Sequence, residues 1–106
     1  MSAPVVYISG PITGVNNYWL PFEDAEDELA STGLAVINPA KLPEGMTRRQ
    51  YMAINLVSLM TADAVLTLPG WDNSIGAVIE VSLARYCGIP VYHTIEQLAE
   101  DRTWEE

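Results

Sequence analysis

The chain has 106 residues, of which 49% are hydrophobic, enough to form the core of one domain and to argue against wholesale disorder. Its formal net charge of −9 argues against binding long nucleic acid, although backbone amides and helix N-termini can still hold a single nucleotide. Cys87 is the only cysteine, no apolar run reaches the roughly 18 residues that span a bilayer, and no signal peptide is recognisable, so we expect one cytoplasmic domain over residues 1–106.

The first part of the chain predicts a strand, a loop and a helix. The apolar run "PVVYIS" (residues 4–9) indicates a buried strand that ends at Gly10 and Pro11. The loop "GPITGVNN" follows, and the pattern is helical from about Asn17 to Ser31, with Gly33 as the stop. The apolar face of this helix comprises Phe22, Ala25, Leu29 and Ala30. The carboxylates of residues 23–28 are expected on solvated surface.

The remaining elements continue the same alternation. A second strand (34–39) is followed by a helix that Thr47 caps and that runs to about Thr61. The apolar set of that helix comprises Tyr51, Ile54, Leu56, Leu59 and Met60. A third strand, "DAVLTLPG", leads into a third helix, "NSIGAVIEVSLARYCG", entered through Asn73 or Ser74. The strand "IPVYH" and a short helix, "IEQLAED", capped by Thr94, end the pattern.

Strands that alternate with helices indicate an α/β fold with a parallel sheet covered on both faces. The strands are nearly continuous apolar runs, as expected when both faces are buried. Right-handed crossovers favour a four-stranded sheet of order 2-1-3-4. Ligands of such sheets bind beyond the carboxyl ends of strands 1 and 3, where "SGPITG" and "PGWDNS" meet.

Glu80 is the one charged residue between Asp72 and Arg85, in an otherwise apolar helix. Its neighbours one turn earlier, Gly76 and Ala77, are small, and helical side chains lean toward the N-terminus of their helix. The carboxylate is therefore expected to point toward the ligand site. Burial would raise its pKa and nearby donors would lower it, as at many catalytic carboxylates. A glutamate on a partly exposed stripe, or one paired with a buried arginine, is the alternative.

Other candidates surround this position. Tyr7 can hydrogen-bond Glu80 and hold it, or can be a buried tyrosine bonded to the backbone. Thr13 and Gly14 carry a weak phosphate-binding pattern, with a simple turn as the alternative. Trp71 lies in the predicted ligand loop and can stack on a base, with a packing or interface role as the alternative. His93 is the lone histidine and has no ligand cluster around it, so no metal and no cofactor are predicted.

The segments "YISGPITG", "INPA" and "ADAVLTLPGWDNSIGAVIEVSLARYCGIPVY" together resemble the nucleoside 2-deoxyribosyltransferase superfamily, in particular a small phage and bacterial branch. This resemblance implies a flavodoxin-like fold and cleavage of an N-glycosidic bond. It implies that Glu80 attacks the sugar carbon and that Tyr7 orients it. Ser74 matches a phosphate-binding serine of the related 2′-deoxynucleoside 5′-monophosphate hydrolases, which favours a phosphorylated ligand.

Asn55 departs from the superfamily pattern, which has an aspartate near the leaving base at the matching place. An amide cannot act as a general acid, although Asp72 is a possible substitute. An N-glycosidase or transferase is therefore weighed against a non-catalytic nucleotide-binding protein and against an interaction protein that has lost the site. The residues predicted to line the substrate site are Ser9, Gly10, Pro11, Thr13, Gly14, Asn55, Trp71, Asp72, Ser74 and Gly76. A homo-oligomer, dimer or tetramer, is expected through the second and third helices.

Overall fold

The four strands form one parallel sheet, as the alternation of elements predicts. The computed structural model describes residues 2–101 and 103–105. Neighbouring strands are parallel and follow the order β2-β1-β3-β4, which confirms the predicted order 2-1-3-4. The strands are β1 (Val5–Ser9), β2 (Ala35–Ile37), β3 (Ala64–Thr67) and β4 (Val91–Tyr92).

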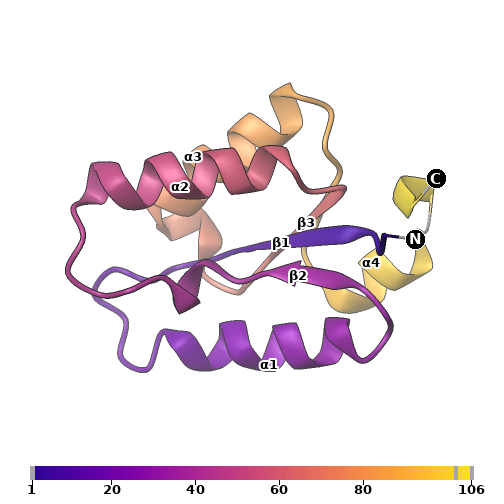
Figure 1. Ribbon diagram of the computed structural model, residues 1–106, viewed down its shortest axis with the longest axis horizontal. Coiled ribbons are helices and arrows are strands. Elements are labelled where there is room, and N and C mark those ends of the chain that lie inside the picture. The colour runs from indigo at the N-terminus through magenta and orange to yellow at the C-terminus, as the bar shows by residue number, and fades with distance from the viewer. Residues whose placement is uncertain (1, 102, 106) are drawn as a thin grey trace.

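Helices lie on both sides of this sheet and produce the three-layer, flavodoxin-like arrangement (Figure 1). The helices are α1 (Trp19–Ala30), α2 (Arg48–Met60), α3 (Ile75–Tyr86) and α4 (Ile95–Glu100). Short 3₁₀ turns are η1 (Pro39–Lys41), η2 (Trp71–Asn73) and η3 (Thr103–Glu105). In Figure 1, α2 and α3 lie above the sheet and pack against each other, whereas α1 lies below it.

Side-chain caps begin three of the helices where the sequence predicts them. Thr47 and Gln50 form a capping box at the start of α2. Ser74 caps α3 by accepting a hydrogen bond from the Ala77 amide, and Thr94 caps α4. Ser74 therefore both caps α3 and links this helix to η2. This position fixes where α3 begins after the ligand loop.

The side chains of β1 alternate between two hydrophobic cores. Val6 and Ile8 belong to the core that lies against α1 and α4. Tyr7 belongs to the other core, which contains residues of α2 and α3. Because strand side chains alternate with a period of two, Ser9 points to the same side as Tyr7. Two hydroxyl groups of β1 therefore face α3.

Part of the predicted apolar set of α2 is not in the core. Leu59 is buried, but Ile54 and Met60 are 41% and 49% exposed. At 100° per residue, the predicted set spreads over more of the helix than one core can cover. Ala30 of α1, expected on the buried face, is likewise exposed. The outer side of α2 consequently carries apolar side chains that nothing in the described chain covers completely.

No helix within residues 2–101 and 103–105 has the length and apolar character needed to span a bilayer. The longest of them, α2, has 13 residues.

Candidate functional site

The carboxyl ends of β1 and β3 lie side by side and bring the two predicted ligand loops together. Ser9 and Thr67 are register partners in the sheet, and the Leu68 amide donates a 2.8 Å hydrogen bond to the Ser9 carbonyl. A Cβ at Gly10 would lie only 2.9 Å from the Leu68 Cβ. The absence of a side chain at Gly10 therefore allows the two loops to approach this closely.

Glu80 lies in the second turn of α3, and 5% of its surface is exposed. Helical periodicity places it on the inner side of α3, together with the buried residues Ala77 and Ala84. Its side chain therefore enters the layer between α3 and the sheet, where β1 presents Tyr7 and Ser9. The alternative of a glutamate on an exposed stripe is wrong.

Two hydroxyl groups of β1 hold the carboxylate of Glu80. The Tyr7 hydroxyl donates a 2.9 Å hydrogen bond to Oε2, and the Ser9 hydroxyl donates a 2.6 Å hydrogen bond to Oε1. Tyr7 and Ser9 are completely buried. Each oxygen of Glu80 therefore has its own donor, so the orientation of the carboxylate is fixed by the strand beneath it.

A polar side chain of α2 also acts on Glu80. Asn55 is half-buried, and its side-chain amide lowers the pKa of the Glu80 carboxyl. The residue that departs from the superfamily pattern therefore belongs to the same cluster as the predicted nucleophile. We refer to Tyr7, Ser9, Asn55 and Glu80 as the Glu80 cluster.

Burial and hydrogen bonding act on Glu80 in opposite directions. Burial raises the pKa of the carboxyl above its ordinary value of 4.5, while the hydrogen bonds from Ser9, Tyr7 and Asn55 limit the rise. Burial and the adjacent negative charge raise the pKa of the Tyr7 phenol. Tyr7 therefore keeps its proton at neutral pH and acts as a hydrogen-bond donor.

Gly76, one turn before Glu80 in α3, faces α2. A Cβ at Gly76 would lie 3.6 Å from the Met52 Cε, so Met52 lies against this position of α3. The sequence analysis did not single out Met52, since a methionine in an apolar helix gives no signal of its own.

Not every predicted residue contacts the Glu80 cluster. Ser74 is half-buried at the N-terminus of α3, one and a half turns before Glu80. Asp72 is exposed in η2, and Thr13 and Gly14 are exposed in the loop after β1. Pro11 packs beside Gly70, with its Cγ 3.4 Å from where a Cβ of Gly70 would be. These residues border the carboxyl ends of the strands without touching Glu80.

Trp71 has protein neighbours on its indole ring. The ring stacks on His93 with a centroid distance of 5.3 Å and an interplanar angle of 10°. The Arg85 guanidinium lies 5.9 Å from the centroid of the same ring. A base can therefore stack on the face that His93 covers only if the histidine moves. The sequence analysis did not foresee this stack, because its members come from a loop, a strand end and a helix.

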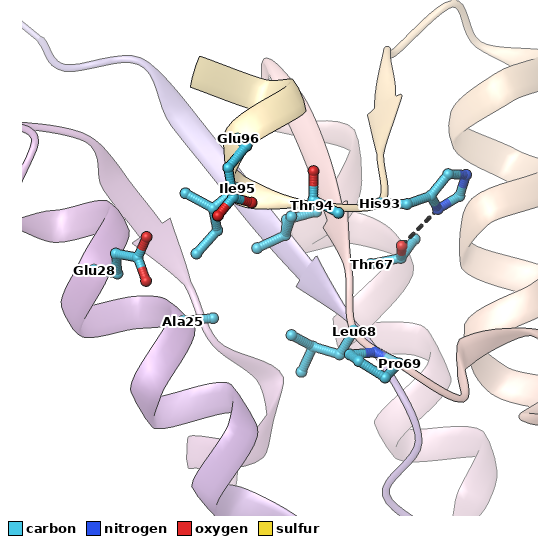
Figure 2. A pocket seen from close by; sticks show the side chains of 10 residues that line it. Ala25, Glu28, Thr67, Leu68, Pro69, His93, Thr94, Ile95 and Glu96 are labelled. Atoms are coloured by element: carbon cyan, nitrogen blue, oxygen red, sulfur yellow. Dashed lines mark hydrogen bonds between the residues drawn. The ribbon is translucent and has the colours of Figure 1, made fainter. Parts of the chain in front are cut away.

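His93 also reaches the sheet beside Ser9. Its Nδ1 lies 2.7 Å from the Thr67 hydroxyl, and Thr67 is the register partner of Ser9 (Figure 2). Thr67 is buried at the end of β3. The sequence analysis did not single out Thr67. Strand side chains alternate with a period of two, so Thr67 could have been placed on the same face as Val65, which belongs to the Tyr7 core.

Two surface hollows lie near this end of the sheet, and Glu80 lines neither. One, of about 200 Å³, lies between α1, the end of β3 and the start of α4 (Figure 2). The other, of about 420 Å³, runs along the first turns of α3 and is lined by Asp72, Asn73, Ser74, Ile75, Val78 and Ile79. The second hollow includes the predicted residues Asp72 and Ser74, but Ile75, Val78 and Ile79 place it on the exposed side of α3, whereas Glu80 lies on the inner side.

The sequence matches one known family over most of its length. Comparison with curated proteins yields no match. Residues 4–93 match a family described as "Domain of unknown function (DUF4406)". All four members of the Glu80 cluster, together with Ser74, Trp71 and His93, fall within the matched residues. Because the match covers well over half of the chain, the protein belongs to the DUF4406 family.

Proposed function

We propose that the protein cleaves or transfers at the N-glycosidic bond of a 2′-deoxynucleoside or its 5′-monophosphate. The observation that carries this proposal is the buried Glu80 carboxylate, held by the Tyr7 hydroxyl at 2.9 Å and the Ser9 hydroxyl at 2.6 Å. A carboxylate buried without an ionic partner costs stability, so it indicates a function rather than a contribution to folding. The resemblance to nucleoside 2-deoxyribosyltransferases supplies the substrate class.

In the proposed reaction, Glu80 is the nucleophile. One of its oxygens attacks C1′ of the deoxyribose, an ester bond forms, and the base leaves with the electron pair of the broken C1′–N bond. Water or a second base then attacks the same carbon and releases the carboxylate. Tyr7 and Ser9 orient the attacking group through their hydrogen bonds. Two displacements at one carbon retain its configuration.

A 5′-phosphate would lie at the start of α3. This helix has 12 residues, and its N-terminal amides attract an anion. Ser74 adds a hydroxyl group at that position. The small ligand is thus proposed to extend from Ser74 toward Glu80.

A non-catalytic nucleotide-binding protein is the second candidate. Asn55 favours it, because an amide in the Glu80 cluster can hold a base or a sugar but cannot protonate a leaving base. This candidate retains the ligand, the location of the site and the role of Ser74. It differs only in the absence of turnover.

One assay separates the two candidates. The protein is incubated with each 2′-deoxynucleoside and each 5′-monophosphate, and free base is followed by chromatography. We expect release of base, a deoxyribosyl adduct on Glu80 in intact-protein mass spectra, and a loss of at least about 100-fold in rate for Glu80→Gln. Release of no base, combined with a ligand-induced rise in melting temperature, contradicts the enzyme and supports the binding protein. Full activity of Glu80→Gln contradicts the assigned nucleophile.

We further propose that the protein is a cytoplasmic homo-oligomer. Seven exposed large hydrophobic residues lie on α2 and α3, and we call them the α2–α3 face: Ile54, Val57, Met60, Ile75, Val78, Ile79 and Tyr86. Val57, Ile75 and Tyr86 are 70%, 82% and 90% exposed. Exposed apolar side chains on two helices that pack against each other are typical of a protein interface.

The charges of these helices favour a second copy of the chain as the partner. The chain carries fourteen Asp and Glu, yet α2 contains none and the single one of α3, Glu80, is buried. Copies with a net charge of −9 repel each other over most of their surface. The α2–α3 face is the region where two copies can meet without opposing carboxylates.

A further inference from the structure

Within residues 2–101 and 103–105, no cationic side chain pairs with the buried Glu80 carboxylate. The Tyr7 phenol and the Ser9 alcohol donate hydrogen bonds to it, and the neutral Asn55 amide lowers its pKa. The ion pair found within residues 2–101 and 103–105 lies elsewhere and joins Lys41 to Glu26. A buried anion that has neutral donors but no positive partner attracts a ligand that carries a positive charge next to it.

None of these partners can protonate the departing base, and Asp72, the possible substitute, is exposed in η2 and lies outside the Glu80 cluster. When the C1′–N bond breaks, its electron pair moves to the base, and a neutral base leaves as an anion unless an acid protonates it. The Asn55 amide does not supply a proton, and the raised pKa of Tyr7 keeps its proton on the phenol, which donates to Glu80. Among the described residues, His93 is bonded to Thr67 and stacked on Trp71 rather than bonded to Glu80.

We propose that the Glu80 site acts on N-glycosides whose base already carries a positive charge, such as an N7-alkylated purine or a pyridinium nucleotide. This inference rests on the proposed function, since it takes Glu80 as the nucleophile. A Glu80 oxygen forms a bond to C1′, the C1′–N bond breaks, and its electron pair neutralises the ring nitrogen. The base departs as a neutral molecule with no proton transfer. Water then attacks C1′, its proton passes to solvent, and the Glu80 carboxylate is restored.

The two features of the cluster act together on such a substrate. The uncompensated carboxylate favours binding of the cation in the ground state, and the departure of a neutral base removes the need for the acid that Asn55 does not provide. A neutral nucleotide gains neither advantage at this site. Asn55, which stands where the superfamily pattern has an aspartate, weakens the case for nucleotides with a neutral base. The same residue therefore favours nucleotides with a positively charged base.

A matched pair of substrates tests the inference. The protein is incubated with 7-methyl-2′-deoxyguanosine 5′-monophosphate and with 2′-deoxyguanosine 5′-monophosphate, which differ by one methyl group and one charge. Spontaneous loss of the methylated base is subtracted by using Glu80→Gln as the blank. We expect cleavage of the methylated nucleotide to be at least about 100-fold faster. Equal cleavage of the two overturns the inference and leaves the proposed function intact. No release above the blank from these or any other nucleotide overturns the proposed function itself.

A gain-of-function variant supplies the second arm. Asn55→Asp introduces a carboxylic acid into the cluster, so cleavage of 2′-deoxyguanosine 5′-monophosphate should rise by at least about 10-fold and the preference for the methylated nucleotide should narrow. Asn55→Ala is the matched control, because it removes the amide without adding an acid, and it should leave the preference in place. A folded Asn55→Asp variant whose preference equals that of the wild type overturns the inference.

Discussion

The Tyr7 hydroxyl donates a 2.9 Å hydrogen bond to Glu80 Oε2, although the two residues are 73 positions apart in the chain. Parallel strands and a helix that follows β3 bring them together. We predict that Tyr7→Phe leaves Oε2 without this donor, costs about 1–3 kcal/mol of unfolding free energy and raises the pKa of Glu80 further. Urea denaturation and the pH dependence of the proposed activity measure the two effects.

Tyr92→Phe is the matched control for that variant. The Tyr92 hydroxyl donates a hydrogen bond to the exposed residue Asp101, outside the Glu80 cluster. We expect this variant to change stability less than Tyr7→Phe and to leave the pH profile unchanged. Equal effects of the two substitutions on the pH profile would contradict the orienting role of Tyr7.

The raised pKa of Glu80 predicts how stability depends on pH. Because the folded carboxyl binds its proton more tightly than the unfolded one, the native state holds more protons just above pH 4.5. The contribution of Glu80 to stability is therefore largest below that pH, falls as the pH rises through the folded pKa, and is constant above it. Chemical denaturation from pH 4 to pH 8 should show this decline in the wild type and a smaller one in Glu80→Gln. Parallel curves for the two proteins would refute the assignment.

Ser74 combines two roles that a pair of variants can separate. Ser74→Ala removes the cap of α3 and should cost about 1 kcal/mol, and it should weaken binding of 5′-monophosphates more than binding of nucleosides. Thr47→Ala removes the corresponding cap of α2 and should cost a similar amount without changing the affinity for phosphate. Calorimetry with both ligand series measures this. A loss of phosphate affinity in both variants argues against a phosphate at Ser74.

Gly10 should tolerate no side chain. The Cβ of Gly10→Ala would lie 2.9 Å from the Leu68 Cβ, so the loops must separate, at a cost of about 1–3 kcal/mol. Gly76→Ala is the control, since its Cβ would make an ordinary contact of 3.6 Å with Met52 and alanine is favoured within a helix by about 1 kcal/mol. Thermal unfolding of both variants gives the comparison. A Gly10→Ala protein as stable as the wild type would show that the loops are not held at this distance.

The α2–α3 face should control the oligomeric state. Val57→Glu places a charge on a residue that is 70% exposed within the face, and we expect it to convert a dimer or tetramer to monomers. Leu20→Glu changes an exposed leucine of α1, outside the face, and should leave the assembly intact. Sedimentation velocity distinguishes the species. If the wild-type protein is monomeric at high concentration, the proposed homo-oligomer is wrong.

Much of the fold follows from local signals in the sequence. The strands are apolar runs bounded by Gly and Pro, and the helices begin at Thr47, Ser74 and Thr94, whose hydroxyls form caps. The helix predicted from Asn17 to Ser31 begins two residues later in the structure, at Trp19. Residues just before a helix can fit its sequence pattern without making its hydrogen bonds. The exposure of Ile54 and Met60 could not be predicted, since it depends on how α2 sits against α3.

Individual members of the candidate site could be predicted from the sequence, but not all of their contacts. Glu80 stands out as a charge in an apolar helix, and Tyr7 follows from the strand beneath it. Asn55 lowers the pKa of the same carboxyl from another helix, which requires the packing of α2 on α3. The stack of Trp71 on His93 joins two loops that are distant in sequence, and neither residue has a local signal that names its partner.

The alternation of β1 has a consequence for how this family can change. Tyr7 and Ser9 face Glu80. Val6, which precedes Tyr7, and Ile8, which lies between Tyr7 and Ser9, face the opposite core. Insertion or deletion of one residue before Tyr7 within the strand would turn the two hydroxyls into the α1 core and present two hydrocarbons to the carboxylate. Sequence drift can therefore replace individual side chains here, but a change in the length of β1 would disable the site and the core in a single event.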